Sequence, residues 1–474
     1  MAQYLIGVIA GILFLKSSTF TRRTHNMKTN IFREGVFAII IAVIILLPQE
    51  SYGFSLFKKK TELKIWHTEV DSGAKKVLKE ICKDFQNSHK DVKIEIEAIP
   101  WGDLATKLSI AIASGNPPDI AHIQPFMAAS LYEKGLLAPI DEVIQDIGEN
   151  DIYEVVRDLL LFDGHYYGIA YAMGTTYFAY RADWAREKGL DEPHNWEEYV
   201  TFIREIQEGN KNGTILPGGD LFFIDQLFAE LLVCNGGRLF DENWRPTFTE
   251  RSFIEVLRFF QEVSKYAPPG WVNISYQEQF RYFASGLCAT VPVAYGRAAK
   301  QIEKDVPEEI SGPEHFAVMI QPVGPSGTKS FATIDCENWV IFKDSKNIEL
   351  AKEFLKYFYR PDNYLAFCQT VPLHLIPIRR SLAQAYSKEP FLAKWGSWYN
   401  QALSAIADGR VRPIFLVEDD DKFIPFLFEF QKTRIISDAV MDVTTGGKSP
   451  EETASRAQKR AEEYIERIGY KKWQ

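Results

Sequence analysis

Apolar and polar residues alternate at two-residue spacing in two stretches near the start of the globular part of the chain. Residues 61–67 and 92–99 both show this pattern, which is typical of strands with one buried face. Residues 72–87 place apolar side chains at helical spacing, and residues 104–113 do so again before a short apolar strand at 120–123. This alternation of strands and helices predicts a doubly wound parallel α/β sheet.

A junction at residues 114–123, with the sequence SGNPPDIAHI, joins the second helix to the third strand. Its prolines, Pro117 and Pro118, prevent the helix from continuing and favour an extended entry into the strand. We expect Asp119 to stabilise the turn. Gln124 follows the strand, and ligands of α/β sheets bind at the carboxyl ends of strands, so this exit is a candidate binding position.

The same periodicity predicts elements through the rest of the chain. Residues 168–180 have the pattern of two extended segments, and Asn195 is expected to cap the helix that follows it. Further helices are expected at residues 128–134, 183–188, 196–209, 225–234, 249–266, 277–284, 348–359, 361–370 and 449–467, and further strands at 288–294, 316–322 and 338–342. The sequence shows no internal repeat.

Length and composition indicate a globular protein of two or three domains. The 474 residues are 46% hydrophobic and 25% charged, which is ordinary for a chain with a sizeable core. Aromatic residues make up 14% of the chain, enough to supply rings to a ligand site as well as to the core. The formal net charge of −9 argues against non-specific binding to nucleic acid.

The N-terminus carries two apolar segments, residues 5–15 and 36–47, each shorter than the roughly 20 residues of a membrane-spanning helix. The second segment has the anatomy of a secretory signal, with basic residues before it and small residues after it. We therefore expect residues 1–53 to form a signal peptide, cleaved after Gly53, that sends the protein to the periplasm. Met27 is an alternative start of translation, and an uncleaved membrane anchor is the alternative to cleavage.

The cysteines and the short motifs give no sign of catalytic or metal chemistry. The five cysteines, which are Cys82, Cys234, Cys288, Cys336 and Cys368, lie far apart and show no CxxC spacing. They are expected to be buried apolar residues, with one or two disulfides as the alternative. The sequence contains no HExxH, no GxxxxGK[ST] and no nucleophile elbow, so neither a cofactor nor a metal is expected.

An ordered series of landmarks runs along residues 61–470. They are the first strand with LKIWHTE, the junction at 114–123, YGIAYAMGTTYFAYRADWAREKGL (167–190), NWEEY (195–199), FASGLCATVPVAYG (283–296), NIELAKEFLKYF (347–358) and IPIRRS (376–381). In this order and spacing they resemble family 1 of the extracellular solute-binding proteins, the maltose-binding-protein-like subunits that capture ligands for ABC importers. The resemblance covers nearly all of the chain after the signal peptide.

This resemblance implies a type II periplasmic-binding-protein fold, with two α/β lobes joined by hinge segments that let the lobes close over a ligand. Lobe 1 would comprise residues 61–169 and 322–360, and lobe 2 residues 170–321 and 361–474. The chain would cross between the lobes near residues 169–172, 318–321 and 359–362.

A cleft for a sugar should combine aromatic rings, which stack on the apolar face of the sugar, with planar polar groups that pair with its hydroxyls. The candidate ligand contacts lie at strand ends and at positions that match the family, and they are Trp66, His67, Gln124, Phe126, Thr175, Thr176, Asp225, Gln226, Tyr295, Arg297, Asp335, Glu337, Trp339 and His374. Each has a structural alternative, such as helix capping for Asp225 or strand packing for Thr175. Tyr295 stands where the family often has tryptophan. Asp335 and Glu337 stand in a stretch where the family usually has glycines, which suggests a more polar ligand.

The resemblance and the absence of a catalytic constellation favour a periplasmic protein that binds a carbohydrate and delivers it to an ABC importer. Its partners would be the permease subunits and their ATPase in the inner membrane, and the protein would act as a monomer without enzymatic activity. A binding protein for glycerol phosphate or a polyamine is the alternative. A secreted glycan hydrolase that uses paired carboxylates is the third hypothesis.

Overall fold

The computed structural model describes residues 60–294, 296–413, 416–417 and 422–469. The expected signal peptide and its cleavage site lie outside these residues, as does Tyr295. These residues form one compact unit. Among the described helices we find none with the length and apolar character that a membrane crossing requires.

The first lobe is built around a five-stranded sheet with the order β2-β1-β3-β12-β6. Strand β1 (Thr61–His67) lies between β2 (Val92–Ala98) and β3 (Ile120–Ile123) and runs parallel to both. Strands β12 (Asn338–Ile341) and β6 (Ile169–Ala170) complete the sheet in antiparallel orientation. The expected parallel unit is therefore present, but distant strands make the whole sheet mixed.

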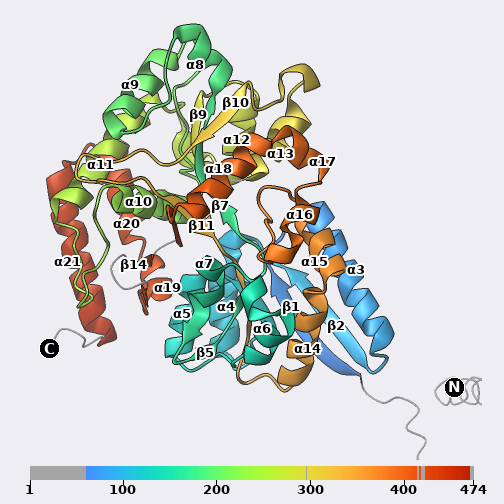
Figure 1. Ribbon diagram of the computed structural model, residues 1–474. Coiled ribbons are helices and arrows are strands. Elements are labelled where there is room, and N and C mark those ends of the chain that lie inside the picture. The colour runs from blue at the N-terminus through green and yellow to red at the C-terminus, as the bar shows by residue number, and fades with distance from the viewer. Residues whose placement is uncertain (1–59, 295, 414–415, 418–421, 470–474) are drawn as a thin grey trace, which may run out of the picture. The chain divides into compact units, whose positions relative to one another are not determined.

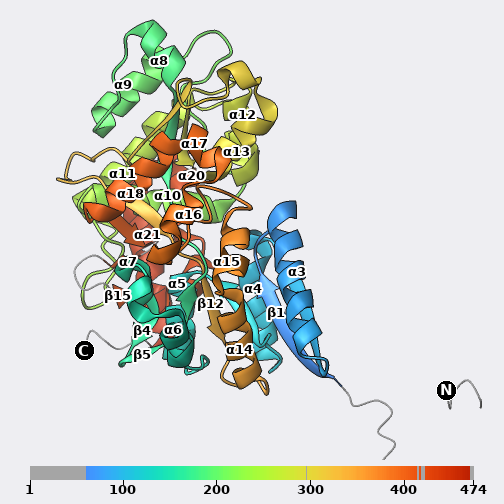
Figure 2. The same ribbon diagram turned by 45° about the vertical axis from the view of Figure 1, so that its right-hand side comes forward.

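Helices pack on this sheet through their apolar faces. Helix α3 (Ser72–Ser88) packs on β2, and α14 (Ile348–Phe358) packs on α3, on β12 and on α6 (Asp141–Ile147), as Figures 1 and 2 show. Helix α4 (Trp101–Ala113) connects β2 to β3, and α5 (Pro125–Glu133) follows β3. The periodicity predicts α3, α4, α5 and α14 to within a few residues at each end, but it did not predict α6.

Asp119, at the entrance to β3, fastens two parts of the first lobe together. One carboxylate oxygen accepts the backbone N–H of Lys64 at 2.7 Å, and the other accepts Nδ2 of Asn347 at 3.2 Å and the hydroxyl of Ser345. The first contact holds β3 beside β1, and the others hold the segment between β12 and α14. Asp119 is therefore the structural carboxylate that the junction sequence predicts.

The second lobe contains an antiparallel sheet with the order β10-β8-β9, drawn at the top of Figure 1. Its strands are β8 (Tyr177–Arg181), β9 (Thr290–Ala294) and β10 (Phe316–Met319). Helix α12 (Tyr276–Ala284) packs on β9 and on α13 (Gly296–Asp305). The resulting pair of α/β lobes is the predicted type II architecture.

A third, small sheet lies where the chain passes between the lobes. Strand β7 (Gly174–Thr175) comes between β6 and β8 in sequence, and β11 (Ala332–Asp335) comes between β10 and β12. These strands pair in antiparallel fashion, and β13 (Val411–Pro413) adds to β11. Two passages of the chain are thus hydrogen-bonded side by side. Helix α15 (Pro361–Cys368) packs against α3 and α14. The residue ranges that we expect for the two lobes remain a prediction.

A helical layer completes the second lobe. Helix α10 (Leu221–Cys234) packs on α11 (Arg251–Val263) and α20 (Ile435–Thr444), which α21 (Pro450–Ile468) covers. Helix α10 begins four residues earlier than predicted, so Asp225 lies inside the helix and does not cap it. The alternative role of Asp225 as a helix cap was wrong, because the apolar residues 221–224 already form the first turn of the same helix.

Asn195 does cap its helix, α9 (Trp196–Ile206), by accepting the N–H of Glu198 at 2.9 Å. The remaining helices are α7 (Glu154–Arg157), α8 (Ala182–Lys188), α16 (Ala383–Tyr386), α17 (Pro390–Lys394), α18 (Gly396–Ala407), α19 (Leu427–Gln431) and the 3₁₀ turns Glu149–Asp151, Asp158–Leu160, Ser264–Tyr266, Trp271–Asn273, Glu308–Ile310 and Arg380–Leu382. The remaining strands are the short pairs β4 (Leu161–Phe162) with β5 (His165–Tyr166) and β14 (Leu416–Val417) with β15 (Lys422–Phe423).

All five cysteines are buried, and none of them forms a disulfide. Burial raises the pKa of Cys82 to about 12 and also raises the pKa of Cys288, Cys336 and Cys368. The interpretation of these cysteines as small buried apolar residues therefore fits the structure, and disulfides do not.

Candidate functional site

Buried polar residues from both lobes and from the strands between them meet in one place. We call this group the interlobe cluster, and its members are Glu69, His122, Gln124, Tyr171, Arg297, Asp335, Glu337 and His374. Strand ends and loops supply the members from the first lobe, and the first turn of α13 supplies Arg297.

Arg297 and Glu69 form an ion pair across the two lobes. Nη2 of Arg297 donates to Oε2 of Glu69 at 2.8 Å, and the side chain of Glu69 is only 2% exposed. Burial alone would raise the pKa of Glu69, but the Arg297 charge and the Tyr171 hydroxyl hold it below its usual value. Glu69 is therefore ionised at neutral pH. A second pair, Lys300 with Asp71 at 2.8 Å, joins the lobes nearer to solvent.

The hydroxyl of Tyr171 lies between two carboxyl groups. It is 2.6 Å from Oε1 of Glu69, and it also contacts Oε2 of Glu337 closely. A phenol carries one proton and can donate to only one of these oxygens. Burial, followed by the charge of Glu69, raises the pKa of Glu337 to about 8, so Glu337 is protonated at neutral pH in this closed arrangement. The proton of Glu337 can then be donated to Tyr171, whose own proton goes to Glu69.

The histidines of this region are neutral. Nδ1 of His122 accepts the backbone N–H of Thr68 at 3.2 Å, which leaves its proton on Nε2, 3.3 Å from Oε2 of Glu337. Burial lowers the pKa of His122 to about 3, and burial followed by the His122 charge lowers that of His67 to about 4. Burial and then Arg297 lower the pKa of His374 well below its ordinary value.

Gln124 and Asp335 extend the cluster toward α5. Nε2 of Gln124 donates to Oδ1 of Asp335 at 2.9 Å, while the buried Oε1 of Gln124 has no partner within the described structure. Burial, followed by the charge of Glu337, raises the pKa of Asp335 well above its usual value. The amide and the carboxyl group therefore present hydrogen-bond acceptors to the interior.

Aromatic rings surround these polar groups. The ring of His122 lies 4.1 Å from Tyr171, 5.5 Å from Trp339 and 5.7 Å from Trp101, measured between centroids. Trp101, which also hydrogen-bonds Glu337, lies parallel to Phe222 of α10 with centroids 6.4 Å apart. Rings from both lobes thus form apolar walls next to the carboxyl groups.

A second polar group, on the α10 side, consists of Thr176, Gln226, Glu230 and Gln321. Nε2 of Gln321 donates to Oε2 of Glu230 at 3.0 Å, and Nε2 of Gln226 donates to Oε1 of Glu230 at 2.8 Å. Burial raises the pKa of Glu230 to about 7. The charges of Arg297, Asp335, Glu337 and Glu230 all act on the phenol of Tyr276, which places this group next to the interlobe cluster.

The structure brings together many of the candidate contacts predicted from the sequence. Gln124, Arg297, Asp335, Glu337 and His374 belong to the interlobe cluster, His67 and Trp339 border it, and Thr176 and Gln226 form part of the second polar group. Their roles as ligand contacts remain a prediction. Tyr295 lies outside the described residues.

Four other candidates lie in packing positions instead. The ring of Trp66 is covered by Nζ of Lys107 at 4.7 Å, and Phe126 is fully buried in the core. The hydroxyl of Thr175 donates to the hydroxyl of Tyr177. Because successive residues of an extended chain point to opposite sides, Thr175 and Thr176 face in opposite directions. Asp225 lies under α20, where burial raises its pKa to about 8 and Ser437 donates to it.

The sequence interpretation missed several members of these groups, namely Glu69, Trp101, His122, Tyr171, Glu230 and Gln321. Tyr171 and Gln321 lie inside the predicted crossing segments, and Glu69 follows the first strand by two residues. A search of the crossing segments for every polar or aromatic residue would have found Tyr171 and Gln321. Glu230 carries no signal of its own, because it lies in an apolar helix interior.

One group of described residues has spacing that a metal ion could use. Glu69, Glu337 and His374 each offer a ligand atom, and these atoms lie within 4.8 Å of one another. Glu69, however, is already engaged by Arg297 and Tyr171. A metal ion would therefore compete with existing partners.

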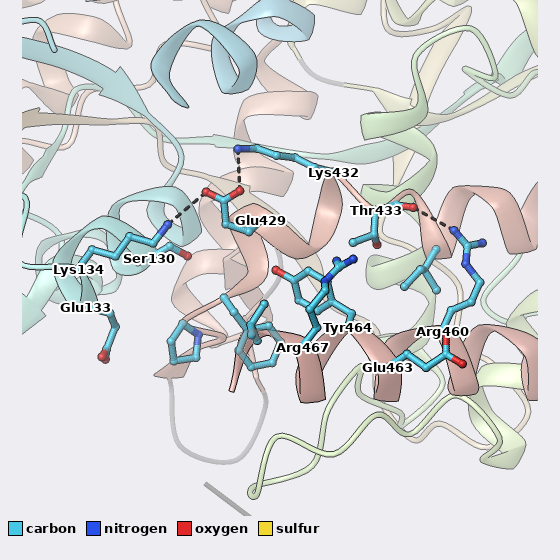
Figure 3. Close-up of a pocket in the computed structure, with 14 residues that line it drawn as sticks. Ser130, Glu133, Lys134, Glu429, Lys432, Thr433, Arg460, Glu463, Tyr464 and Arg467 are labelled. Atoms are coloured by element: carbon cyan, nitrogen blue, oxygen red, sulfur yellow. Dashed lines mark hydrogen bonds and ion pairs between the residues drawn. The ribbon is translucent and has the colours of Figure 1, made fainter. Parts of the chain in front are cut away.

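A separate surface pocket of about 1070 Å³ lies between α5 and the C-terminal helices (Figure 3). Glu429 pairs there with Lys134 at 3.2 Å and with Lys432 at 2.9 Å, and Arg460 donates to the backbone of Thr433. Charged side chains of both signs line this pocket, and it shares no residue with the interlobe cluster. We therefore consider the interlobe cluster the candidate functional site.

Comparison with known proteins identifies the family. The model of the family described as bacterial extracellular solute-binding protein matches residues 67–364, which is more than half of the chain. This chain belongs to the bacterial extracellular solute-binding proteins. The matched segment contains every member of the interlobe cluster except His374.

Two curated relatives have similar sequences. The mannitol-binding protein of Pseudomonas aeruginosa is 27% identical over 219 residues, which is 45% of this chain and 50% of that protein. The arabinooligosaccharide-binding protein of Bacillus subtilis is 24% identical over 291 residues, 59% of this chain and 65% of that protein. The chain thus spans one half to two thirds of the length of these relatives.

Solved structures agree on the fold. An ABC-transporter solute-binding protein from Agrobacterium radiobacter, in complex with ribitol, superposes with a TM-score of 0.70 at 19% identity. The superposition covers 85% of this chain and 98% of that one. The two-lobed architecture therefore extends over nearly the whole described region.

Proposed function

We propose that this protein captures a carbohydrate between its two lobes and delivers it to an ABC importer. The observation that carries the proposal is the interlobe cluster, in which Arg297 of one lobe meets Glu69 of the other at 2.8 Å inside a ring of buried acceptors. Residues that both lobes supply come together only when the lobes are closed. A ligand that bridges them stabilises that closed state.

The chemistry of the cluster suits polyhydroxylated molecules. Gln124, Asp335 and Glu337 offer buried oxygens to hydroxyl donors, and the amide groups of the second polar group add further donors and acceptors. The walls formed by Trp101, Tyr171 and Trp339 match the apolar faces of sugar rings. The relatives that bind mannitol and arabinooligosaccharides and the complex with ribitol support this ligand class.

The cellular setting follows from the family and from the N-terminal sequence. An extracellular solute-binding protein with residues 1–53 as a signal peptide would work in the periplasm, as a monomer. The permease subunits in the inner membrane would recognise the closed form, and their ATPase would drive uptake. No group in the proposed site is assigned a catalytic role, because closure and release require no covalent step.

The phosphate alternative is weaker than the carbohydrate proposal. An anion requires a free guanidinium or a helix N-terminus. Arg297 is committed to Glu69, so its guanidinium is not available to a phosphate. A polyamine has the opposite charge and is a second candidate that the carboxyl groups of Asp335 and Glu337 favour.

A thermal-shift screen against sugars, polyols, oligosaccharides, glycerol phosphate and polyamines tests the proposal. A ligand at 100 times its dissociation constant stabilises the folded protein by about 2.7 kcal/mol. This stabilisation raises the melting temperature. We expect at least one carbohydrate to raise the melting temperature of the protein. A shift with only glycerol phosphate or a polyamine would show that the proposed function is wrong.

A further inference from the structure

The interlobe cluster contains more acidic groups than it can neutralise. Three buried carboxyl groups, from Glu69, Asp335 and Glu337, lie around a single guanidinium, that of Arg297, which already pairs with Glu69. The nearby histidines are held neutral by burial. Glu230 of the adjacent group adds a fourth carboxyl group, whose hydrogen-bond partners among the described residues are amide and hydroxyl groups.

The hydrogen bonds around Tyr171 also leave the cluster one positive charge short. Its hydroxyl contacts both Glu69 and Glu337, and it has only one proton to share between them. Nε2 of His122 lies 3.3 Å from Oε2 of Glu337 without forming a hydrogen bond, and the imidazole is neutral, so the two carboxylates have one cation, Arg297, between them. Without a ligand this charge is supplied by a proton on Glu337. A bound cation would replace that proton.

Buried acceptors without a hydrogen-bond partner support the same conclusion. Oε1 of Gln124, whose residue is 3% exposed, has no hydrogen-bond partner within the described structure, although its Nε2 is fixed on Asp335. Oε1 of the fully buried Gln321 is in the same state beside Glu230. Buried acceptors that lack donors cost stability. They indicate a ligand that brings several donors at once.

We propose that the carbohydrate captured here carries a protonated amine, as an amino sugar or an amino polyol does, and that its ammonium group is held between Glu337 and Asp335. This inference rests on the proposed function and specifies its ligand class. An ammonium group offers three donors and a positive charge on one small atom. The rings of Trp101 and Trp339 add the aromatic surroundings that stabilise a cation.

An ammonium fits this cluster better than a metal ion does. A metal needs free lone pairs at about 2.0–2.2 Å, and both oxygens of Glu69 are already engaged, by Arg297 and Tyr171. Of the three described residues with metal-ligand spacing, Glu69 is therefore already engaged, which leaves Glu337 and His374. An ammonium binds at hydrogen-bond distance and can use Asp335, Glu337 and Gln124 without displacing these partners.

The test compares ligands that differ only in the amine. The purified protein is titrated by calorimetry at pH 7 with glucamine against sorbitol, and with the glucosamine disaccharide against cellobiose. We expect the amine of at least one pair to bind at least tenfold more tightly than its hydroxyl counterpart. Glu337→Gln should reduce this preference to about threefold or less, since one charge is removed. Glu349→Gln, an exposed carboxylate on α14, is the matched control and should keep the preference.

The other outcomes separate this inference from the proposed function. If the hydroxyl compounds, or other neutral sugars, bind as tightly as the amines or more tightly, the inference is wrong and the proposed function stands. If Zn²⁺ or Mn²⁺ alone raises the melting temperature and Glu337→Gln abolishes that rise, the missing charge belongs to a metal and the inference is wrong. If spermidine binds and no carbohydrate does, both the proposed function and the inference are wrong.

Discussion

Gly296 lies directly against the backbone of His374. A Cβ atom on Gly296 would come within 2.6 Å of the backbone nitrogen of His374, and it would also overlap Leu373. Gly296 opens α13 next to Arg297, and His374 belongs to the loop after α15. This close approach holds Arg297 and His374, two members of the interlobe cluster, near each other.

Gly296→Ala should therefore destabilise the protein, because the methyl group must push apart two segments of backbone. We expect a loss of about 1–3 kcal/mol in the free energy of unfolding, measured in urea. Gly396→Ala is the control, since a Cβ at Gly396 meets nothing within 4 Å and alanine favours the helix there. Equal stability of the two variants would contradict the close packing at Gly296.

Replacement of Arg297 should weaken both the fold and ligand binding. Arg297→Gln leaves Glu69 buried beside Tyr171 without its cation, which costs about 3–5 kcal/mol when a buried pair is broken. We expect at least a tenfold loss of affinity by calorimetry for any carbohydrate found in the screen. Arg204→Gln removes an exposed pair with Glu205 and should change neither quantity. An unchanged affinity of Arg297→Gln would remove this residue from the site.

The stability of the ligand-free protein should fall as the pH rises from 6.5 to 8. The pKa of Glu337 is raised to about 8 by burial, so the folded state keeps a proton that the unfolded chain has already lost in this range. The stabilising contribution is fully present below the ordinary pKa of a glutamate and is lost as the pH rises through the folded value. Asp335 and Glu230 shift in the same direction.

Glu337→Gln should make the free energy of unfolding less dependent on pH. The slope should change by up to about 1.4 kcal/mol per pH unit, which is the effect of one proton bound in the folded state and not in the unfolded state. Urea unfolding at intervals between pH 6.5 and pH 8 measures it, and Glu349→Gln again serves as the control. A variant with the same slope as the natural protein would show that Glu337 is not protonated in the folded state. The buried histidines act in the opposite sense, because the unfolded chain binds protons that His67 and His122 do not bind in the folded state. Their effect fades as the pH rises above the ordinary histidine value of 6.5.

The cysteines should be inert in the folded protein. All five thiols are buried, and burial raises the pKa of Cys82 to about 12. A thiol reagent such as DTNB should therefore react with none of them faster than the protein opens, and with all five in concentrated urea. Rapid reaction of a thiol in the native protein, or fewer than five thiols after unfolding, would contradict the structure.

Local patterns in the sequence predicted the elements well but not the way they assemble. The strand over Thr61–His67 and the cap at Asn195 depend on neighbouring residues only, and both have the expected positions. The antiparallel addition of β12 and β6 to the first sheet depends on contacts between residues more than 150 positions apart. Periodicity carries no information on such pairings.

The same reasoning applies to the candidate site. Arg297 and Glu337 stand next to strand ends, where the physical expectation for ligands pointed, and the structure places both in the interlobe cluster. Thr175 and Asp225 were selected by the same argument but face the core, because one residue of alternation or one helical turn decides the direction of a side chain. Glu69 and Tyr171 became recognisable only once the chain segments that carry them were seen together.

The most direct test of the central claim is a crystal structure of the protein with a carbohydrate found in the screen. We expect the ligand to lie between the lobes and to contact Glu337, Asp335 and Gln124, with an aromatic ring of Trp101 or Trp339 beside it. A ligand in the pocket between α5 and α21, or one that leaves these residues untouched, would contradict the account.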